Sequence, residues 1–169
     1  MQLIAETYVF LKLACGLNAP ESAEIFRKLD GGILKSYLTE ISVDVLDKED
    51  ELADGYLIDY ILDKAGNKGT GKWTSKEGAD LGIAVPTITA ALNARFMSSF
   101  KQKREELAPN YSMQVLDEDM DMEVEEVFEE VENALYVCVI LSYIQGYELM
   151  NAAAKEYGWE IDWAEVSRI

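Results

Sequence analysis

Apolar residues recur at spacings of three and four along nearly the whole chain, and this pattern constrains the fold more than any other feature. Such spacing places apolar side chains on one face of an α-helix, whereas a half-buried strand alternates apolar and polar residues. The sequence therefore predicts an all-α fold, and its 169 residues suit one domain of ordinary size. The first stripe runs through Leu3, Ile4, Tyr8, Leu11 and Ala14.

Glycines, prolines and capping residues divide this pattern into segments. Three glycines within residues 66–71 argue against a helix interior there, and Thr74 with Glu77 forms a capping-box pattern that would restart the helix. We expect a charged loop over 48–55 and a polar linker over 108–120. We expect helices over residues 1–15, 20–30, 33–47, 56–64, 74–81, 86–107 and 121–157, and a short one after Asp162.

Both ends of the chain lack the features of a complete domain. No Ser, Thr, Asp or Asn precedes the stripe that begins at Leu3, although helices usually begin with such a cap. The helix opened by Asp162 has too few residues before Ile169 to be stable by itself. We therefore expect a segment of a longer protein, with fraying of a complete protein as the alternative.

The balance of charge excludes several classes of function. The chain has 32 acidic and 15 basic residues, a net charge of −17, and no histidine. This surplus argues against binding to nucleic acid and against attachment to anionic membranes. Without histidine, a Ser-His-Asp triad, a Cys-His pair and a His-ligated zinc site are excluded.

The two cysteines, Cys15 and Cys138, lie in apolar helical stretches. We expect them to be buried free thiols of a reducing compartment rather than a disulfide. No charged and then apolar leader opens the chain, so a cytoplasmic location is expected.

Residues 66–73, here called the glycine loop, carry the main chemical signal. They fit the first seven positions of a GxxxxGK phosphate loop, but Trp73 stands where the Ser or Thr that ligates magnesium should be. The preceding segment has a helical pattern where such a loop needs a strand, which disfavours a nucleotide site. Anion binding is still favoured, because glycines let N–H groups approach closely and Lys68, Thr70 and Lys72 offer charge and a hydroxyl. The alternative is a helix cap followed by a flexible connector with solvated lysines.

Arg95 is the second candidate for an anion site. It lies beside the apolar stripe of Ile88, Leu92 and Phe96. Such an arginine can extend to the surface or pair with a carboxylate. It can equally bind a phosphate, because the guanidinium fork matches phosphate oxygens in a bidentate way.

The acidic residues concentrate between positions 117 and 132. A calcium loop starting at Asp117 would need Gly sixth and Glu twelfth, but Met122 and Phe128 stand there, so we expect no metal site. We expect instead a solvated helix face opposite a stripe of apolar residues. Residues 134–144 carry no charge and are too few to span a bilayer, which favours burial in a core or in a dimer interface.

Several motifs resemble those of the 6-phosphogluconate dehydrogenases. The Lys-Gly-Thr-Gly-Lys-Trp-Thr segment at 68–74 is similar to the hallmark of that family. Further similar motifs stand at 1–6, 36–38, 61–63, 94–96, 134–136, 142–143, 145–146 and 157–159.

The resemblance implies a helical substrate-binding and dimerisation domain over 1–169, in which Lys68, Thr70 and Arg95 hold the substrate phosphate. The family oxidises and decarboxylates 6-phosphogluconate to ribulose 5-phosphate with NADP, in the pentose phosphate pathway. It also implies a homodimer, with 6-phosphogluconate or another phosphate or sulfate anion at the glycine loop.

The parts of the family pattern that this sequence lacks are equally informative. In the family, the Rossmann domain and the catalytic lysine and glutamate precede the position that matches Met1. No GxGxxG fingerprint of a dinucleotide-binding domain occurs in this sequence. In the family, a tail with an arginine and a histidine follows the position that matches Ile169. We therefore expect no catalytic residue, no bound cofactor and no activity in this chain alone. Basic residues that the family places just before Ala134 and at Val139 are also missing. The alternative is a non-catalytic acidic helical module that kept the fold.

Overall fold

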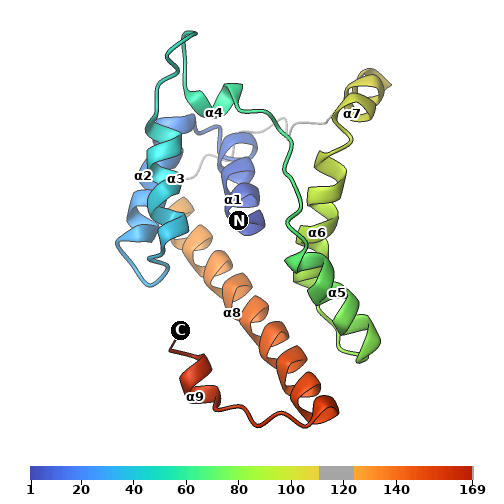
Figure 1. Ribbon diagram of the computed structural model, residues 1–169. Helices are drawn as coiled ribbons and strands as arrows, with labels where there is room; N and C mark the ends of the chain where they lie inside the picture. Colours follow the sequence, from blue (N-terminus) through green and yellow to red (C-terminus); the bar gives the residue numbers. More distant parts are fainter. Residues whose placement is uncertain (111–123, 169) are drawn as a thin grey trace. The chain divides into compact units, whose positions relative to one another are not determined.

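The computed structural model describes residues 1–110 and 124–168 (Figure 1). Within these ranges the secondary structure consists of helices, with one isolated bridge between Glu49 and Tyr56 and no β-strand. The predicted all-α fold, with one very long helix near the C-terminal end, is therefore confirmed. No helix in the described part of the chain is long and apolar enough to cross a membrane.

The chain divides into two compact units. The first unit comprises Met1–Lys64 and Phe100–Cys138, and the second comprises Ala65–Ser99 and Val139–Ile169. The long helix α8 (Val124–Tyr157) contributes residues to both units.

The first unit contains the better-buried core. It is built from α1 (Gln2–Leu13), α2 (Ala19–Asp30), α3 (Tyr37–Asp47), the short α4 (Leu57–Tyr60), α7 (Lys101–Leu107), a 3-10 turn (Ala108–Asn110) and the first part of α8. Apolar side chains at three and four spacing meet in its interior, and each fully buried one contributes about 1.5–3 kcal/mol relative to exposure. The largest fully buried apolar side chains among the described residues are those of Leu11, Ile25, Phe26 and Leu29.

Capping explains where α3 begins. Its N-cap is Ser36, whose hydroxyl accepts the N–H of Thr39, while the Thr39 hydroxyl accepts the N–H of Ser36. This reciprocal pair satisfies two of the N–H groups that a helix start leaves without partners. The predicted start at Ile33 was therefore wrong by four residues, because a turn over 31–34 precedes the cap.

The helix predicted over 56–64 is also largely wrong. It ends at Tyr60, and Ile61 adopts an extended conformation with ψ 132°. Beyond it, the Asp63 carboxylate binds Lys101 at 2.5 Å and Arg104 at 2.7 Å, and Arg104 also donates to the Asp63 carbonyl. These contacts hold the segment in an extended form that does not permit a further helical turn.

The second unit contains α5 (Thr70–Asp80), α6 (Pro86–Ser98), the rest of α8 and the short α9 (Trp163–Val166). Helices α5 and α6 are joined by a hydrogen bond between the Ser75 and Thr89 hydroxyls. Thr87 donates its N–H and hydroxyl to Gln145 on α8, and the Tyr157 hydroxyl donates to Glu77 on α5. Polar contacts therefore hold much of this unit together.

The long helix predicted over 86–107 is interrupted. Helix α6 ends at Ser98 and α7 begins at Lys101. The hydroxyls of Ser98 and Ser99 donate to the carbonyls of Arg95 and Phe96, a local bonding pattern that competes with helix continuation.

The predicted ends of α5 and α8 agree with the structure. Helix α5 stops before Gly82, which has φ +68°, and α8 stops before Gly158, which has φ +69°. Asp162 caps α9, accepting the N–H groups of Ala164 and Glu165. The predicted linker residues 111–120 and helix residues 121–123 lie outside the described residues.

Candidate anion-binding site

Helix α5 begins inside the glycine loop, at Thr70, so the predicted start at Thr74 was wrong. Gly69 has φ +101°, a conformation that glycine adopts without strain, and it turns the chain directly into the helix. The Trp73 N–H donates to the Gly69 carbonyl, and the Thr74 hydroxyl donates back to the Thr70 carbonyl instead of capping a new helix.

This earlier start places the N-terminal end of α5 within the loop itself. The N-cap residue is Gly69, and among the described residues no side chain caps this end of the helix. The N–H groups of a first helical turn have no partner within the helix, and together they form a region of partial positive charge that favours anions. Thr70 contributes both such an N–H group and an exposed hydroxyl.

Arg95 lies on α6 and reaches the glycine loop. Its Nη1 donates to the Gly66 carbonyl at 3.3 Å, and in the described part of the structure it forms no ion pair with a carboxylate. One turn earlier, Leu92 lies against Gly71, where an added Cβ would be 3.6 Å from Leu92 Cδ1. Helix α6 therefore runs alongside the first turn of α5, and Arg95 is in contact with the start of the loop.

Lys68 and Thr70 follow closely in sequence after Gly66, the residue that Arg95 contacts. Lys68 is exposed and stands two residues after Gly66. Between them, the Asn67 side chain accepts the Gly69 N–H at 2.7 Å, which folds the loop into a turn. All three predicted residues therefore lie in the glycine loop or, for Arg95, in hydrogen-bond contact with it.

Four cations in this part of the second unit, Lys68, Lys72, Lys76 and Arg95, form no ion pair among the residues that the structure describes. Many basic residues elsewhere are neutralised by carboxylates. Those in ion pairs are Lys12, Arg27, Lys28, Lys48, Lys101, Arg104 and Arg168. In a strongly acidic chain, the glycine loop therefore retains uncompensated positive charge that is available to an anion.

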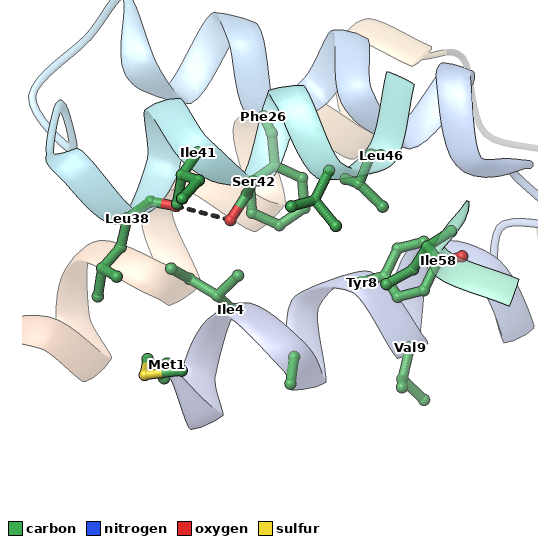
Figure 2. Close-up of a pocket in the computed structure, with 12 residues that line it drawn as sticks. Met1, Ile4, Tyr8, Val9, Phe26, Leu38, Ile41, Ser42, Leu46 and Ile58 are labelled. Carbon is green, nitrogen blue, oxygen red and sulfur yellow. Dashed lines mark hydrogen bonds between the residues drawn. The ribbon is translucent and has the colours of Figure 1, made fainter. Parts of the chain in front are cut away.

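An apolar groove in the first unit has different chemistry (Figure 2). It has a volume of about 350 Å³, and in it Ile4 and Tyr8 of α1 lie opposite Leu38 and Leu46 of α3. The Ser42 hydroxyl in the lining donates to the Leu38 carbonyl at 2.6 Å. Because its lining offers no cation, this groove does not suit a phosphorylated ligand.

The family model described as 6-phosphogluconate dehydrogenase, C-terminal domain, matches residues 1–169, the whole chain. The chain belongs to the 6-phosphogluconate dehydrogenase family. The resemblance inferred from the motifs is thereby confirmed.

Individual relatives agree with this assignment. The chain is 43% identical over 169 residues to the decarboxylating 6-phosphogluconate dehydrogenase of Lactococcus lactis subsp. cremoris. It is also 43% identical to the NADP(+)-dependent, decarboxylating enzyme of Bacillus subtilis. Both matches cover all of this chain but only 35% and 36% of the relatives. The chain therefore spans about a third of their length.

A solved structure shows the same fold. The 6-phosphogluconate dehydrogenase of Plasmodium falciparum, described in its apo form and in complexes with NADP+ and with its substrate 6-phosphogluconate, is 41% identical to this chain. The TM-score is 0.93, and the match covers 99% of this chain and 36% of that one. This likeness confirms the helical C-terminal domain fold of the family.

No disulfide joins the two cysteines of this family member in the described structure, and both are half-buried rather than buried as predicted. Partial burial raises the pKa of the Cys15 thiol, because desolvation disfavours the thiolate. In the described ranges, no group of three or more Cys, His, Asp or Glu side chains is placed so that it could hold a metal ion.

Helix α8 shows the predicted solvated acidic face as far as the structure describes it. Val127, Val131 and Leu135 are buried, while most of the neighbouring glutamates are exposed. Among the acidic residues of this stretch, those at 117–121 and Glu123 lie outside the described residues. The exposed glutamates are Glu125, Glu126, Glu129 and Glu130.

The uncharged stretch 134–144 of α8 is mostly exposed in the single chain. Tyr143 is 65% exposed, Val137 54% and Ile144 52%. The predicted burial in the core of this chain is therefore wrong for most of residues 134–144. An interface with another chain remains the prediction that explains its composition.

Proposed function

We propose that this chain is the substrate-binding and dimer-forming part of an NADP-dependent, decarboxylating 6-phosphogluconate dehydrogenase. In this proposal Lys68, Thr70 and Arg95 hold the phosphate group of 6-phosphogluconate. The observation that carries it is the uncompensated positive charge around the open first turn of α5, in a chain with a net charge of −17. The family membership supplies the identity of the substrate.

Each residue contributes a different interaction with the phosphate. Arg95 offers a planar fork that can bind two phosphate oxygens, whereas Lys68 offers a compact point charge. Thr70 offers a hydroxyl and an N–H group at the positive end of α5. Holding a phosphate far from the reacting carbon lets its binding energy orient the rest of the substrate.

The remaining parts of the reaction belong to other residues in this proposal. This chain matches about a third of the relatives' length. The resemblance implies that the catalytic lysine, the catalytic glutamate and the Rossmann domain for NADP lie in the rest. The 169 residues alone should therefore bind 6-phosphogluconate but should not reduce NADP with it. Reduction of NADP by the purified chain in the presence of 6-phosphogluconate would contradict this part of the proposal.

Isothermal titration of the chain with 6-phosphogluconate tests the site. We expect Lys68→Ala to weaken binding more than tenfold, since a charge-assisted hydrogen bond contributes about 1.5–3 kcal/mol. Lys48→Ala is the matched control: it removes the same charge from an exposed lysine that is paired with Glu51. We also expect added KCl to weaken the binding of the wild-type chain.

Two results would overturn the phosphate site. One is an equal loss of affinity in the Lys68→Ala and Lys48→Ala variants, which would show an effect of net charge alone. The other is the absence of any binding by the wild-type chain, which is the behaviour of a non-catalytic helical interaction module.

Sedimentation tests the proposed homodimer. The exposed and uncharged stretch 134–144 is where we place the interface, so Tyr143→Glu should shift the chain from dimer to monomer. Leu52→Glu is the control, because Leu52 is also exposed but lies in the loop between α3 and α4. A clean 19 kDa species of the wild-type chain at micromolar concentration would contradict the dimer.

A further inference from the structure

The last turn of α6 contacts the backbone of two adjacent residues, Ala65 and Gly66, where the chain enters the glycine loop. The Ser98 hydroxyl oxygen accepts the Ala65 N–H at 3.0 Å, and Arg95 Nη1 donates to the Gly66 carbonyl at 3.3 Å. The Ser98 hydroxyl also donates to the Arg95 carbonyl at 2.7 Å. One side chain therefore bridges the backbone of the phosphate-binding arginine and the backbone that leads into the loop.

Such an anchor matters because the loop has little else to order it. Residues 64–68 are exposed and belong to no helix. Glycine-rich segments lose more conformational entropy on ordering than others do, so a few hydrogen bonds decide whether one conformation dominates. Besides the contacts of Ala65 and Gly66, the hydrogen bond from the Gly69 N–H to the Asn67 side chain helps to shape the loop.

We propose that Ser98 is a positioning residue of the phosphate site. By holding Ala65, its hydroxyl fixes the glycine loop against α6, so that Lys68 and Thr70 bind the same phosphate as Arg95. This inference rests on the proposed function, because a fixed loop matters for affinity only if the loop binds the substrate. Ser98 itself does not contact the phosphate in this proposal.

The neighbouring Ser99 provides a matched control. Its hydroxyl donates to the Phe96 carbonyl at 2.6 Å, the same local bond that Ser98 makes to Arg95. Ser99 is exposed, and no hydrogen bond joins it to the glycine loop in the described structure. Removing either hydroxyl therefore costs α6 the same local bond, but only Ser98→Ala also removes the partner of Ala65.

The experiment compares the wild-type chain with Ser98→Ala, Ser98→Thr and Ser99→Ala. Titration with 6-phosphogluconate gives the affinity, and the melting temperature reports general stability. Trypsin cleavage after Lys68, measured without ligand, reports how well the loop is held. This last readout does not depend on the identity of the substrate.

We expect Ser98→Ala to bind 6-phosphogluconate about fivefold more weakly, the loss expected for one neutral hydrogen bond. We also expect faster cleavage after Lys68, with a melting temperature equal to that of Ser99→Ala. Ser98→Thr, which keeps the hydroxyl, should restore both affinity and resistance to trypsin. Ser99→Ala should behave as wild type in both measurements.

The results separate this inference from the function on which it rests. If the wild-type chain binds 6-phosphogluconate but Ser98→Ala binds equally well, the positioning role is wrong and the proposed function stands. Equal weakening in Ser98→Ala and Ser99→Ala would also overturn it, because the effect would then come from α6 alone. If the wild-type chain does not bind, the proposed function fails and this inference fails with it.

Discussion

The two units differ in how completely their apolar side chains are buried and in how many of their basic residues are in ion pairs. In the first unit, Phe26 and several neighbouring side chains are completely buried. Within the described residues most of its basic side chains are in ion pairs, with Lys35, Lys64 and Lys103 as exceptions. In the second unit the best-buried large side chains keep some exposure, 6% for Val85, 7% for Leu149 and 9% for Leu92. Of its described cations, Arg168 alone is in an ion pair.

This difference separates stability from binding. Burial of apolar area is the main stabilising contribution to folding, so the first unit has the larger share of it. A region that binds an anion must leave its cations without internal partners, and it gains little stability from them. The second unit is therefore the expected place of the site, and the first unit is the expected source of rigidity.

The largest expected effect comes from the core of the first unit. Phe26→Ala should lower the free energy of unfolding by about 3–5 kcal/mol, because it removes a completely buried aromatic ring. Leu92→Ala, in the second unit, should cost about 2 kcal/mol, at the low end for a buried leucine, because the site is partly open. Urea denaturation followed by circular dichroism measures both. A larger loss for Leu92→Ala would contradict the comparison.

A smaller effect is expected from the contact between α5 and its following turn. At Gly78 an added Cβ would lie 2.9 Å from the Ile83 carbonyl oxygen and 3.0 Å from Val85 Cγ2. Backbone must move to relieve such a clash, so Gly78→Ala should lower the free energy of unfolding by about 1–3 kcal/mol, although alanine favours helices.

Gly71→Ala, in the same helix, is the control for this prediction. Its added Cβ would meet Leu92 at 3.6 Å, an ordinary van der Waals contact. Thermal unfolding should therefore show no loss of stability in Gly71→Ala. Equal destabilisation of the two variants would show that α5 tolerates no side chain at either glycine.

Local signals in the sequence predicted the presence of most helices, although several of their boundaries were wrong. Three of these signals are confirmed: the apolar stripe of α1, the stop at Gly158 and the cap at Asp162. Each depends on residues that are close together in the sequence. The early end of α4 could not be predicted in this way. It depends on ion pairs between Asp63 and residues about 40 positions later, which no local pattern reveals.

The site was predictable in part. Lys68, Thr70 and Arg95 could be named because the glycine loop is distinctive in an acidic chain and resembles the family hallmark. The start of α5 at Thr70 was missed because three glycines in six positions usually exclude a helix, whereas here Gly69 supplies the entry turn and Leu92 covers Gly71. Ser98 was missed because its partner Ala65 lies 33 residues away.

The smallest expected effect tests the paired charges of the first unit. Hydrogen bonds from Lys101 and then Arg104 lower the pKa of Asp63 from 3.8 to about 2. The ionised carboxylate therefore stabilises the folded chain at pH values above about 4, and this contribution disappears as the pH falls from 4 towards 2. Because these groups are exposed, the effect should be small and weaker at high salt.

Asp63→Asn should thus lower the urea midpoint slightly at pH 7, and the difference from wild type should shrink as the pH falls below 4. Asp54→Asn is the control, because the Asp54 carboxylate forms no ion pair in the residues that the structure describes. Binding of 6-phosphogluconate at pH 7 should be unchanged in the control. If the difference in urea midpoint between Asp63→Asn and wild type did not change with pH, the Asp63 side chain would act through its shape rather than its charge. The ion pairs of the first unit would then not contribute to its stability, and the contrast between paired and unpaired cations would not reflect a difference in stability.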